Sequence, residues 1–269
     1  MLSSGNSCWG CSPGKGAMAS PLLPVAGPSI SVCMATYNGS RFVRRQLETI
    51  LPQLAPQDEL IVSDDASTDG TPALVREVCG ARVRLLHGAF RSPVLNFEQA
   101  LQAAVGEVIV LADQDDIWCP NKLELVRGHF AGRRGERRLV LFDGRVVDEE
   151  ERELHPSIFA LKQSRRGFFR NLYDSSYPGC CLAFSRELLE IALPFPHRIL
   201  MHDMWIAMLA ELCGEILFDP HITIGYRKHA ASTTTFARKF EPVRQISERA
   251  HMAWNLLVRM CELKYHKKI

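Results

Sequence analysis

Short apolar runs alternate with segments of helical periodicity from Ile30 onward, and this alternation constrains the fold more than any other feature. The runs are rich in β-branched residues and Leu, as is typical of strands that are buried on both faces. The segments between them repeat their apolar residues at helical spacing. Strands that alternate with helices imply right-handed βαβ crossovers. We therefore expect an α/β fold with a mostly parallel central sheet flanked by helices.

The expected elements can be placed by residue number. In the first half we expect strands over 30–36, 59–63, 83–86 and 107–112, and helices over 42–54, 71–78 and 92–104. In the second half we expect strands over 139–143, 180–184, 216–218 and 222–226, and helices over 186–192 and 202–212. No GxGxxG motif follows the first strand, which argues against a dinucleotide-binding dehydrogenase.

Composition excludes several classes of protein. The chain has 269 residues and 46% hydrophobic content, which is ordinary for a globular protein, and a net charge of +2 is too small to indicate a nucleic-acid partner. No apolar run approaches the roughly 18 residues of a membrane span, and no signal-peptide pattern begins the chain. The nine cysteines are scattered and odd in number, which indicates reduced thiols. We expect a cytoplasmic protein.

Three regions are expected along the chain. Residues 1–28 are rich in Ser, Gly and Pro without periodicity and are expected to be disordered, residues 29–235 form the domain, and residues 236–269 form a basic amphipathic helical tail. From Arg238 the tail carries eight Lys or Arg against three Glu. We expect it to pack on the domain through one apolar stripe, with a lysine patch available for peripheral membrane contact. The stripe is Ile246, Ala250, Ala253, Leu257 and Cys261, and the patch is Lys264, Lys267 and Lys268.

Carboxylates follow two of the expected strands directly. Asp64 and Asp65 follow the strand 59–63, while Asp113, Asp115 and Asp116 follow the strand 107–112. The carboxyl ends of parallel strands meet at one edge of a sheet, where ligands bind. Neighbouring carboxylates repel one another unless a cation holds them ionised, and Mn²⁺ or Mg²⁺ prefers oxygen ligands. From these residues alone, a solvated acidic turn before the next helix remains an equal alternative.

Five motifs together resemble a known family. They are Ala35-Thr36-Tyr37-Asn38-Gly39, Ser63-Asp64-Asp65-Ala66-Ser67-Thr68-Asp69, Asp113-Gln114-Asp115-Asp116-Ile117-Trp118, His202-Asp203-Met204-Trp205 and Tyr226-Arg227-Lys228-His229. In this order and spacing they resemble family 2 glycosyltransferases, and most of all the bacterial rhamnosyltransferase-like branch. The resemblance covers roughly Ser29 to Thr235 and implies the GT-A fold, a single Rossmann-like domain. Gln114 and Ala66 replace small residues that are commoner in the family, and we expect no consequence.

The resemblance implies roles for individual residues. The nucleotide sugar would be bound by Thr36, Tyr37, Asn38, Asp64, Asp65 and Asp113. Asp113, Asp115 and His229 would hold the metal ion, and Asp203 would be the catalytic base. The acceptor-side candidates are Trp118, Gly179, His202 and Trp205. Without the resemblance, Asp203 would be interpreted as a helix N-terminal acid, His229 as a surface histidine and the two tryptophans as core or pocket-wall aromatics.

The function implied is inverting, metal-dependent transfer of one sugar, with rhamnose as a candidate. The Gln-x-x-Arg-Trp motif of processive family members is absent, which favours one sugar per encounter. The donor would be a dTDP- or UDP-linked sugar, and the acceptor a hydroxyl of a cell-surface polysaccharide, lipopolysaccharide or lipid-linked glycan. The enzyme would work in the cytoplasm, with peripheral contact at the inner face of the membrane. The alternative is a non-catalytic nucleotide-sugar or glycan-binding protein with the same fold. The sequence gives no indication of oligomeric state.

Overall fold

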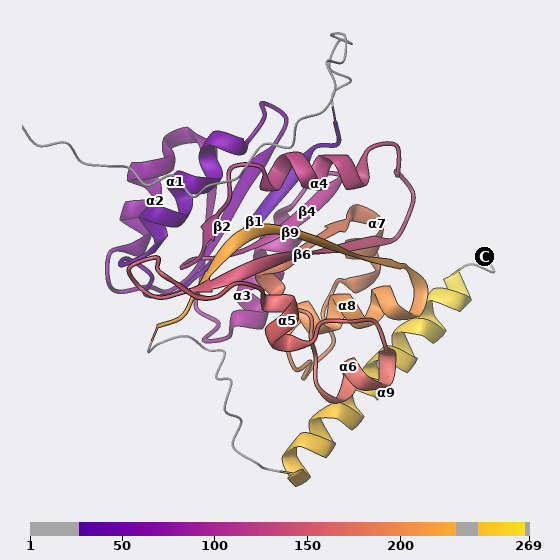
Figure 1. Cartoon of the computed structure of the whole chain (residues 1–269). Helices are drawn as coiled ribbons and strands as arrows, with labels where there is room; N and C mark the ends of the chain where they lie inside the picture. Colours follow the sequence, from indigo (N-terminus) through magenta and orange to yellow (C-terminus); the bar gives the residue numbers. More distant parts are fainter. Residues whose placement is uncertain (1–26, 230–241, 267–269) are drawn as a thin grey trace, which may run out of the picture.

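One mixed sheet forms the centre of the computed structural model, which describes residues 27–229 and 242–266 (Figure 1). Its strands lie in the order β3-β2-β1-β4-β8-β6-β9-β5, and β7 pairs with β6. They are β1 (Ile30–Thr36), β2 (Glu59–Asp65), β3 (Val83–Gly88), β4 (Val108–Asp113), β5 (Ile117–Trp118), β6 (Arg138–Val147), β7 (Glu153–His155), β8 (Leu182–Ser185) and β9 (Glu215–Arg227). Of the expected regions, residues 1–26, 230–241 and 267–269 lie outside the described residues.

The first half of the sheet is parallel, as the alternation of strands and helices predicts. β1 pairs in parallel with both β2 and β4, and β2 with β3. β8 departs from this pattern, because it runs antiparallel to both of its neighbours, β4 and β6. β5 and β7 are also antiparallel to the strands they pair with, whereas β6 and β9 are parallel. The expected α/β class is confirmed, with antiparallel pairing confined to the second half of the sheet.

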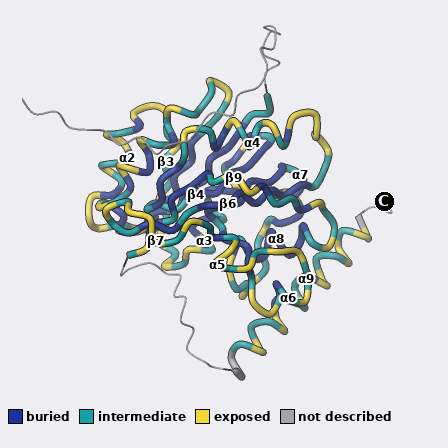
Figure 2. The backbone as a smooth tube through the Cα atoms, in the orientation of Figure 1, coloured by how far each residue is buried: buried dark blue, intermediate teal, exposed yellow. Residues whose placement is uncertain are grey.

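Helices cover both faces of the sheet (Figure 1). α1, α2 and α4 pack on one face, where Val32 and Val110 lie in the core, and α3, α7 and α8 pack on the other, where Cys33 and Leu111 lie. The strands of the sheet are buried along most of their length (Figure 2). Because successive residues of a strand point to opposite faces, these strands divide their side chains between two cores. The helices are α1 (Val43–Ile50), α2 (Thr71–Cys79), α3 (Pro93–Ala103), α4 (Lys122–Phe130), α5 (Ile158–Lys162), α6 (Phe168–Tyr173), α7 (Arg186–Ala192), α8 (His202–Cys213) and α9 (Pro242–His266).

Three strands of the second half differ from the expected bounds. β6, expected over 139–143, runs from Arg138 to Val147. The segments expected as strands 216–218 and 222–226 form one strand, β9, whose pairing with β6 shifts register near Asp143. Pro220 interrupts the apolar pattern, but the strand continues past it with an irregularity in the ladder. The strand expected over 180–184 begins later, at Leu182, because residues 179–181 form a 3₁₀ turn before β8.

The tail helix α9 packs on the domain, but through a different stripe from the one we expected. Met252 and Leu256 are the buried residues of α9, and they join the core against α8. The expected stripe faces outward: Ile246 and Leu257 are more than half exposed, and Cys261 is exposed. Among the residues described, no helix is long and apolar enough to cross a membrane.

Candidate functional site

The carboxyl ends of β1, β2 and β4 meet at one edge of the sheet. The parallel register places Thr36 beside Asp64 and Ala35 beside Asp113. The acidic ends of β2 and β4 therefore lie on either side of the end of β1. Asn96 of α3 fixes the end of β1, because its side-chain amide donates to the Thr36 carbonyl at 3.0 Å. The sheet thus assembles the two acidic segments that sequence analysis placed at a common edge.

Asp64 and Asp65 hold backbone loops in this structure. The buried Asp64 carboxylate accepts hydrogen bonds from the Thr36 hydroxyl at 2.8 Å and from the Ser67 hydroxyl at 2.7 Å. Asp65 accepts from successive backbone N–H groups of residues 90–92, which open α3. A carboxylate that accepts several such bonds is fixed in orientation. Asp64 and Asp65 therefore shape the edge on which Tyr37 and Asn38 lie exposed.

The loop after β1 is anchored to the loop after β2. The Asn38 backbone N–H donates to the Ser67 hydroxyl at 2.8 Å, and the Asn38 side chain accepts from the Thr68 N–H at 2.9 Å. Asn38 has a φ of 45°, in the left-handed region that asparagine tolerates better than most residues. Exposed backbone held in this way is preorganised to contact a ligand.

Asp69 completes this anchor. It accepts hydrogen bonds from the Ser40 backbone N–H at 2.8 Å and from the Thr71 hydroxyl. Burial acts to raise the pKa of Asp69, but the hydrogen bonds from Thr71 and Ser40 outweigh it and lower the pKa to about 2. Asp69 is therefore ionised at neutral pH and ties the start of α1 to the start of α2.

Gln114 clamps the loop after β1 to the acidic segment. Its side-chain carbonyl accepts from the Tyr37 N–H at 2.9 Å, and its amide donates to the Tyr37 carbonyl at 3.1 Å. The clamp passes so close to Gly39 that a β-carbon there would lie 2.1 Å from the Gln114 Oε1. Gln114 therefore has a structural role that sequence analysis did not assign to it, since this side chain holds Tyr37 in place.

The acidic segment itself is crowded and largely buried. Burial, with the charges of Asp115 and Asp203, raises the pKa of Asp113 to about 7. Asp116 is fully buried, and burial with the charges of Asp115 and Asp113 raises its pKa well above the usual range. The Asp116 Oδ2 has no hydrogen-bond partner. The segment is therefore short of positive charge and is not a solvated acidic turn.

Lys122 is a fully buried cation near these carboxylates. Its Nζ donates to the Cys180 carbonyl at 2.9 Å and lies 4.2 Å from the ring centroid of Trp118. Burial lowers the pKa of Lys122, and the neighbouring cysteines and Asp116 oppose that shift. The lysine charge in turn acts to lower the pKa of both Asp113 and Asp116. It offsets only part of the negative charge, since both pKa values remain raised.

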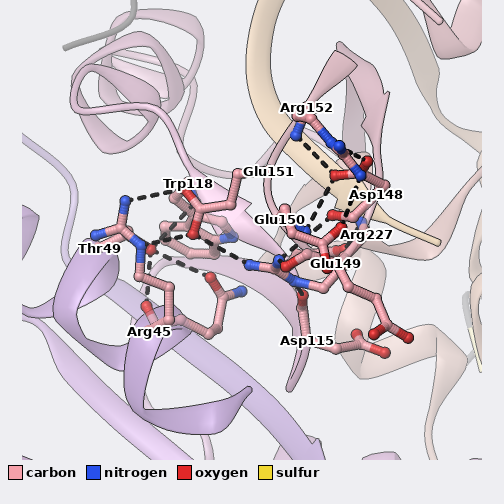
Figure 3. Close-up of polar contacts among 12 residues, drawn as sticks. Arg45, Thr49, Asp115, Trp118, Asp148, Glu149, Glu150, Glu151, Arg152 and Arg227 are labelled. Carbon is pink, nitrogen blue, oxygen red and sulfur yellow. Dashed lines mark hydrogen bonds and ion pairs between the residues drawn. The ribbon is translucent and has the colours of Figure 1, made fainter. Parts of the chain in front are cut away.

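The end of β9 reaches the acidic segment from the other side. β5 pairs with β9, and this pairing brings Arg227 and His229 beside Asp115. The Arg227 guanidinium donates to the Asp115 carbonyl at 3.0 Å and contacts the turn 148–152 through Glu151 at 3.3 Å (Figure 3). The His229 Nε2 lies 2.7 Å from the Asp115 Oδ2. Arg227 therefore fixes the backbone of the acidic segment, and His229 pairs with its side chain.

The candidate metal-ligand atoms at this edge of the sheet fit a hard divalent cation. Asp113, Asp116 and Cys180 have candidate ligand atoms within 4.8 Å of one another, and the Asp116 Oδ2 is unpaired. A bound cation would stabilise the ionised carboxylates that crowding now disfavours. The pKa of the Cys180 thiol is raised well above its usual range, by a hydrogen bond with Cys181 and by burial, so oxygen atoms are the natural ligands. Asp116 was not among the metal ligands expected from the sequence.

Asp203 lies in the first turn of α8, on the side of the site opposite β2. Its Oδ1 accepts from the Met204 N–H at 2.6 Å. Its charge raises the pKa of Asp113, so the two carboxylates lie near each other. Gly179 lies against Asp203: a β-carbon at Gly179 would be 3.0 Å from the Asp203 Oδ2. Asp203 thus stands beside the acidic segment with only backbone next to it on the Gly179 side.

Three of the acceptor-side candidates lie beneath the surface. Trp118 and Trp205 are core residues, and the Trp205 Nε1 donates to the Ala192 carbonyl at 2.9 Å. His202 stacks on Phe97 with ring centroids 3.9 Å apart, and burial lowers the pKa of His202 despite the charge of Asp203. The expectation that these rings meet the acceptor is therefore corrected, because a buried ring cannot contact a bound sugar.

Gln114, Asp116, Lys122 and Arg227 are site residues to which sequence analysis gave no role. Asp116 and Arg227 lie inside quoted motifs, so their positions carried a signal. The position of Lys122 carried no such signal, because a lysine just after a turn is usually exposed. Its burial depends on packing against Trp118 and residues 180–181.

Comparison with known proteins identifies the family. The profile described as "Glycosyl transferase family 2" matches residues 31–191. The UDP-Glc:alpha-D-GlcNAc-diphosphoundecaprenol beta-1,3-glucosyltransferase WfgD of Escherichia coli is 34% identical over 97 residues, which are 36% of this chain and 38% of the relative. The putative glycosyltransferase EpsE of Bacillus subtilis is 34% identical over 103 residues, 37% of each chain. The chain therefore spans well under half the length of these two curated relatives.

Solved structures match over more of the chain. TarS 1-349 of S. aureus in complex with UDP-GlcNAc has a TM-score of 0.65 at 18% identity, covering 84% of this chain and 66% of that one. The mannosyltransferase PcManGT from Pyrobaculum calidifontis, in complex with GDP-Man and Mn²⁺, has a TM-score of 0.58 at 20% identity, covering 91% and 76%. These likenesses show the fold and confirm the GT-A expectation. Since the family profile spans more than half of the chain, and the fold agrees with it, the protein belongs to glycosyl transferase family 2.

Proposed function

We propose that the protein is an inverting, metal-dependent glycosyltransferase that moves one sugar from a nucleotide-diphosphate sugar to an acceptor hydroxyl. The observation that carries the proposal is the placement of two carboxylates at one edge of the sheet: Asp113 lies at the end of β4, and Asp203 lies in the first turn of α8 with only the Gly179 backbone against it. The charge of Asp203 contributes to the raised pKa of Asp113, which agrees with this placement. One carboxylate suits a cation on the leaving diphosphate and the other suits a base.

The donor would bind along the carboxyl ends of β1 and β2. Tyr37 and Asn38 lie exposed there, and Asp64 and Asp65 hold the loops around them. We propose a UDP- or dTDP-linked sugar, with rhamnose as a candidate. The names of WfgD and TarS given above include a UDP sugar, which supports UDP as the first donor to test.

Asp113, Asp115 and His229 would hold Mn²⁺ or Mg²⁺. Asp116, whose Oδ2 has no hydrogen-bond partner, is grouped with Asp113 and is a further candidate ligand. When bound, the cation would stabilise negative charge on the departing diphosphate. Two side chains of the protein would help to orient the bound diphosphate. Arg227 fixes the backbone at Asp115, and Gln114 fixes the backbone of Tyr37.

Asp203 would accept the proton of the attacking hydroxyl. Its Oδ1 is held by the Met204 N–H, which orients the carboxylate, and Gly179 presents no side chain against it. A single in-line displacement with this base would invert the anomeric centre. The lack of the Gln-x-x-Arg-Trp motif supports transfer of one sugar per encounter.

We propose a cell-surface polysaccharide, lipopolysaccharide or lipid-linked glycan as the acceptor, modified in the cytoplasm at the inner face of the membrane. The name of WfgD specifies a diphosphoundecaprenol-linked acceptor, which supports testing a lipid-linked one first.

The test measures nucleoside-diphosphate release from a panel of UDP- and dTDP-sugars, dTDP-rhamnose included, with a synthetic lipid-linked N-acetylglucosamine and with or without Mn²⁺. We expect Asp203→Asn to abolish transfer while Mn²⁺-dependent donor binding, followed by thermal shift, remains. Glu124→Gln is the matched control, because Glu124 is an exposed acid in the first turn of α4.

Two results would contradict the proposal. Near-wild-type turnover in Asp203→Asn would remove Asp203 as the base. Tight donor binding with no transfer from any donor would favour the non-catalytic binding protein.

A further inference from the structure

The tail helix α9 is fixed to the domain by one face. Met252 and Leu256 are buried against the core. Arg259 donates to the Leu193 carbonyl at 3.2 Å and the Pro194 carbonyl at 2.7 Å, and Asn255 donates to the His197 carbonyl at 3.1 Å. These bonds to backbone carbonyls set the rotation of α9 about its own axis. The opposite face of the helix therefore has a defined direction, away from the domain.

That opposite face is apolar and exposed. Figure 2 shows exposed residues recurring along α9. Trp254 is 64% exposed, Leu257 56% and Tyr265 75%. At helical spacing they share one side of α9 with Ile246, Ala250, Val258 and Cys261. A helix on the surface of a globular domain normally presents polar residues outward. α9 has a second apolar face that nothing in the described chain covers.

α6 extends the exposed surface beside α9. Phe169 is 83% exposed and Tyr173 66%. Arg249 of α9 joins the two helices, because its Nε donates to the Tyr173 carbonyl at 2.6 Å and its guanidinium lies 5.2 Å from the Tyr173 ring centroid. Four of the five exposed aromatic residues of the described chain lie on these two helices. We call the exposed residues of α6 and α9 the aromatic face.

The segments that carry the aromatic face are basic. Residues 156–173 contain four Lys or Arg and no Asp or Glu, and residues 242–266 contain four Lys or Arg and two Glu. The net charge of the whole chain is only +2, so the remaining residues are net negative. Glu262, one of the two acids, is paired with Arg259 at 3.2 Å. Arg259 lies on the domain side of α9, with only 12% of its side chain exposed. The exposed cations of these segments include Arg165, Arg166 and Lys264.

We propose that the aromatic face docks on the surface of an anionic lipid bilayer. Tryptophan and tyrosine favour the headgroup region, and a helix with an apolar face and basic flanks lies in the plane of that interface. α9 is 25 residues long, about 37 Å by the usual rise per residue, so it offers a long line of contact. A second copy of this chain is a poorer occupant, because a two-fold interface would bring the same basic segments together. α9 lies on α8, whose first turn carries Asp203.

The test uses the full chain without donor or acceptor, so its result does not depend on the proposed reaction. Flotation compares vesicles of phosphatidylcholine alone with vesicles containing about one third phosphatidylglycerol. We expect binding only to the anionic vesicles, reduced about tenfold or more by Trp254→Asp combined with Leu257→Asp. Val105→Asp combined with Leu154→Asp is the matched control, because both side chains are exposed elsewhere on the domain.

A charge variant tests the basic part of the surface separately. Arg165→Gln combined with Arg166→Gln changes exposed residues only, and we expect weaker binding to anionic vesicles with a smaller dependence on salt. Unchanged melting temperatures would show that each variant is folded.

Three results would overturn the proposal. The wild-type chain could fail to bind anionic vesicles, or the aspartate variant of α9 could bind as well as its control. Alternatively, light scattering could show a dimer that Trp254→Asp with Leu257→Asp dissociates, with no binding to vesicles; the aromatic face would then be a contact between two copies.

Discussion

Gly179 and Asp203 are in such close contact that a β-carbon on the glycine would lie 3.0 Å from the Asp203 Oδ2 and 3.1 Å from its β-carbon. Gly179 begins the 3₁₀ turn before β8, and Asp203 lies in the first turn of α8. The turn that precedes β8 therefore determines where the proposed base stands. The glycine is needed here for space, since its backbone does not adopt a left-handed conformation.

We predict that Gly179→Ala lowers turnover by about 10- to 100-fold, because a displacement of a catalytic group by a fraction of an ångström is costly. Affinity for the donor with Mn²⁺ should stay unchanged, since Thr36 and Asp113 are not touched. Steady-state kinetics and nucleotide titration measure the two quantities. Gly128→Ala is the control, because a β-carbon at Gly128 of α4 meets nothing within 4 Å. Equal turnover in both variants would show that Asp203 has room to adjust.

We predict that Gln114→Ala raises the KM for the donor several-fold with little change in melting temperature. The variant removes both hydrogen bonds that hold the Tyr37 backbone, and the region is exposed. Gly39→Ala should have a similar effect, because its methyl group would displace the same side chain. The double variant should be no worse than either single one, since both changes break one clamp. Additive losses in a double-mutant cycle would contradict this clamp.

The first half of the fold was predictable because its strands are buried runs with clear turns between them. β1 occupies the predicted residues, and so does α7 in the second half. The direction of β8 was not predictable, because a strand buried on both faces has the same sequence pattern in parallel and antiparallel sheets. The packing face of α9 was not predictable either. The helix has two apolar stripes, and periodicity alone does not show which one meets the domain.

The site was predictable only where motifs follow strand ends. Thr36, Asp64 and Asp113 share the expected edge because the parallel register requires it. The environments of Trp118 and Lys122 depend on the antiparallel pairing of β5 with β9 and on packing against residues 180–181, which lie far away in the sequence. Burial set by such distant contacts leaves no local signal.

We predict that Lys122→Met lowers the free energy of unfolding by about 3 kcal/mol, because it removes the buried cation and leaves Asp116 with less compensating charge. Urea denaturation at neutral pH measures the loss. Arg44→Met is the control: Arg44 pairs with Glu77 at the surface, and such pairs contribute at most about 1 kcal/mol. A neutral effect of Lys122→Met would show that Asp116 is protonated and needs no counter-charge.

The final prediction concerns pH and the divalent cation. The pKa of Asp113 is raised from an ordinary value of 3.8 to about 7, by burial and by the charges of Asp115 and Asp203. Between these two values the folded protein holds a proton that the unfolded chain has lost, so without metal its stability falls as pH rises toward about 7. A cation competes with that proton. We therefore expect the affinity for Mn²⁺ to increase by up to about tenfold per pH unit as pH approaches 7 from below, and to level off above it.

The variant Asp113→Asn tests whether the pH dependence comes from Asp113 rather than from the neighbouring acidic residues. The variant has no proton to lose at this position, so the fall in metal-free stability between about pH 4 and pH 7 should become shallower. Binding of Mn²⁺ should weaken strongly, because one oxygen ligand loses its charge. Asp174→Asn is a suitable control, since Asp174 follows α6, outside the acidic segment. Isothermal titration with Mn²⁺ between about pH 6 and pH 8 measures the affinity and the protons released. An affinity that does not depend on pH would mean that Asp113 is already ionised before the cation binds.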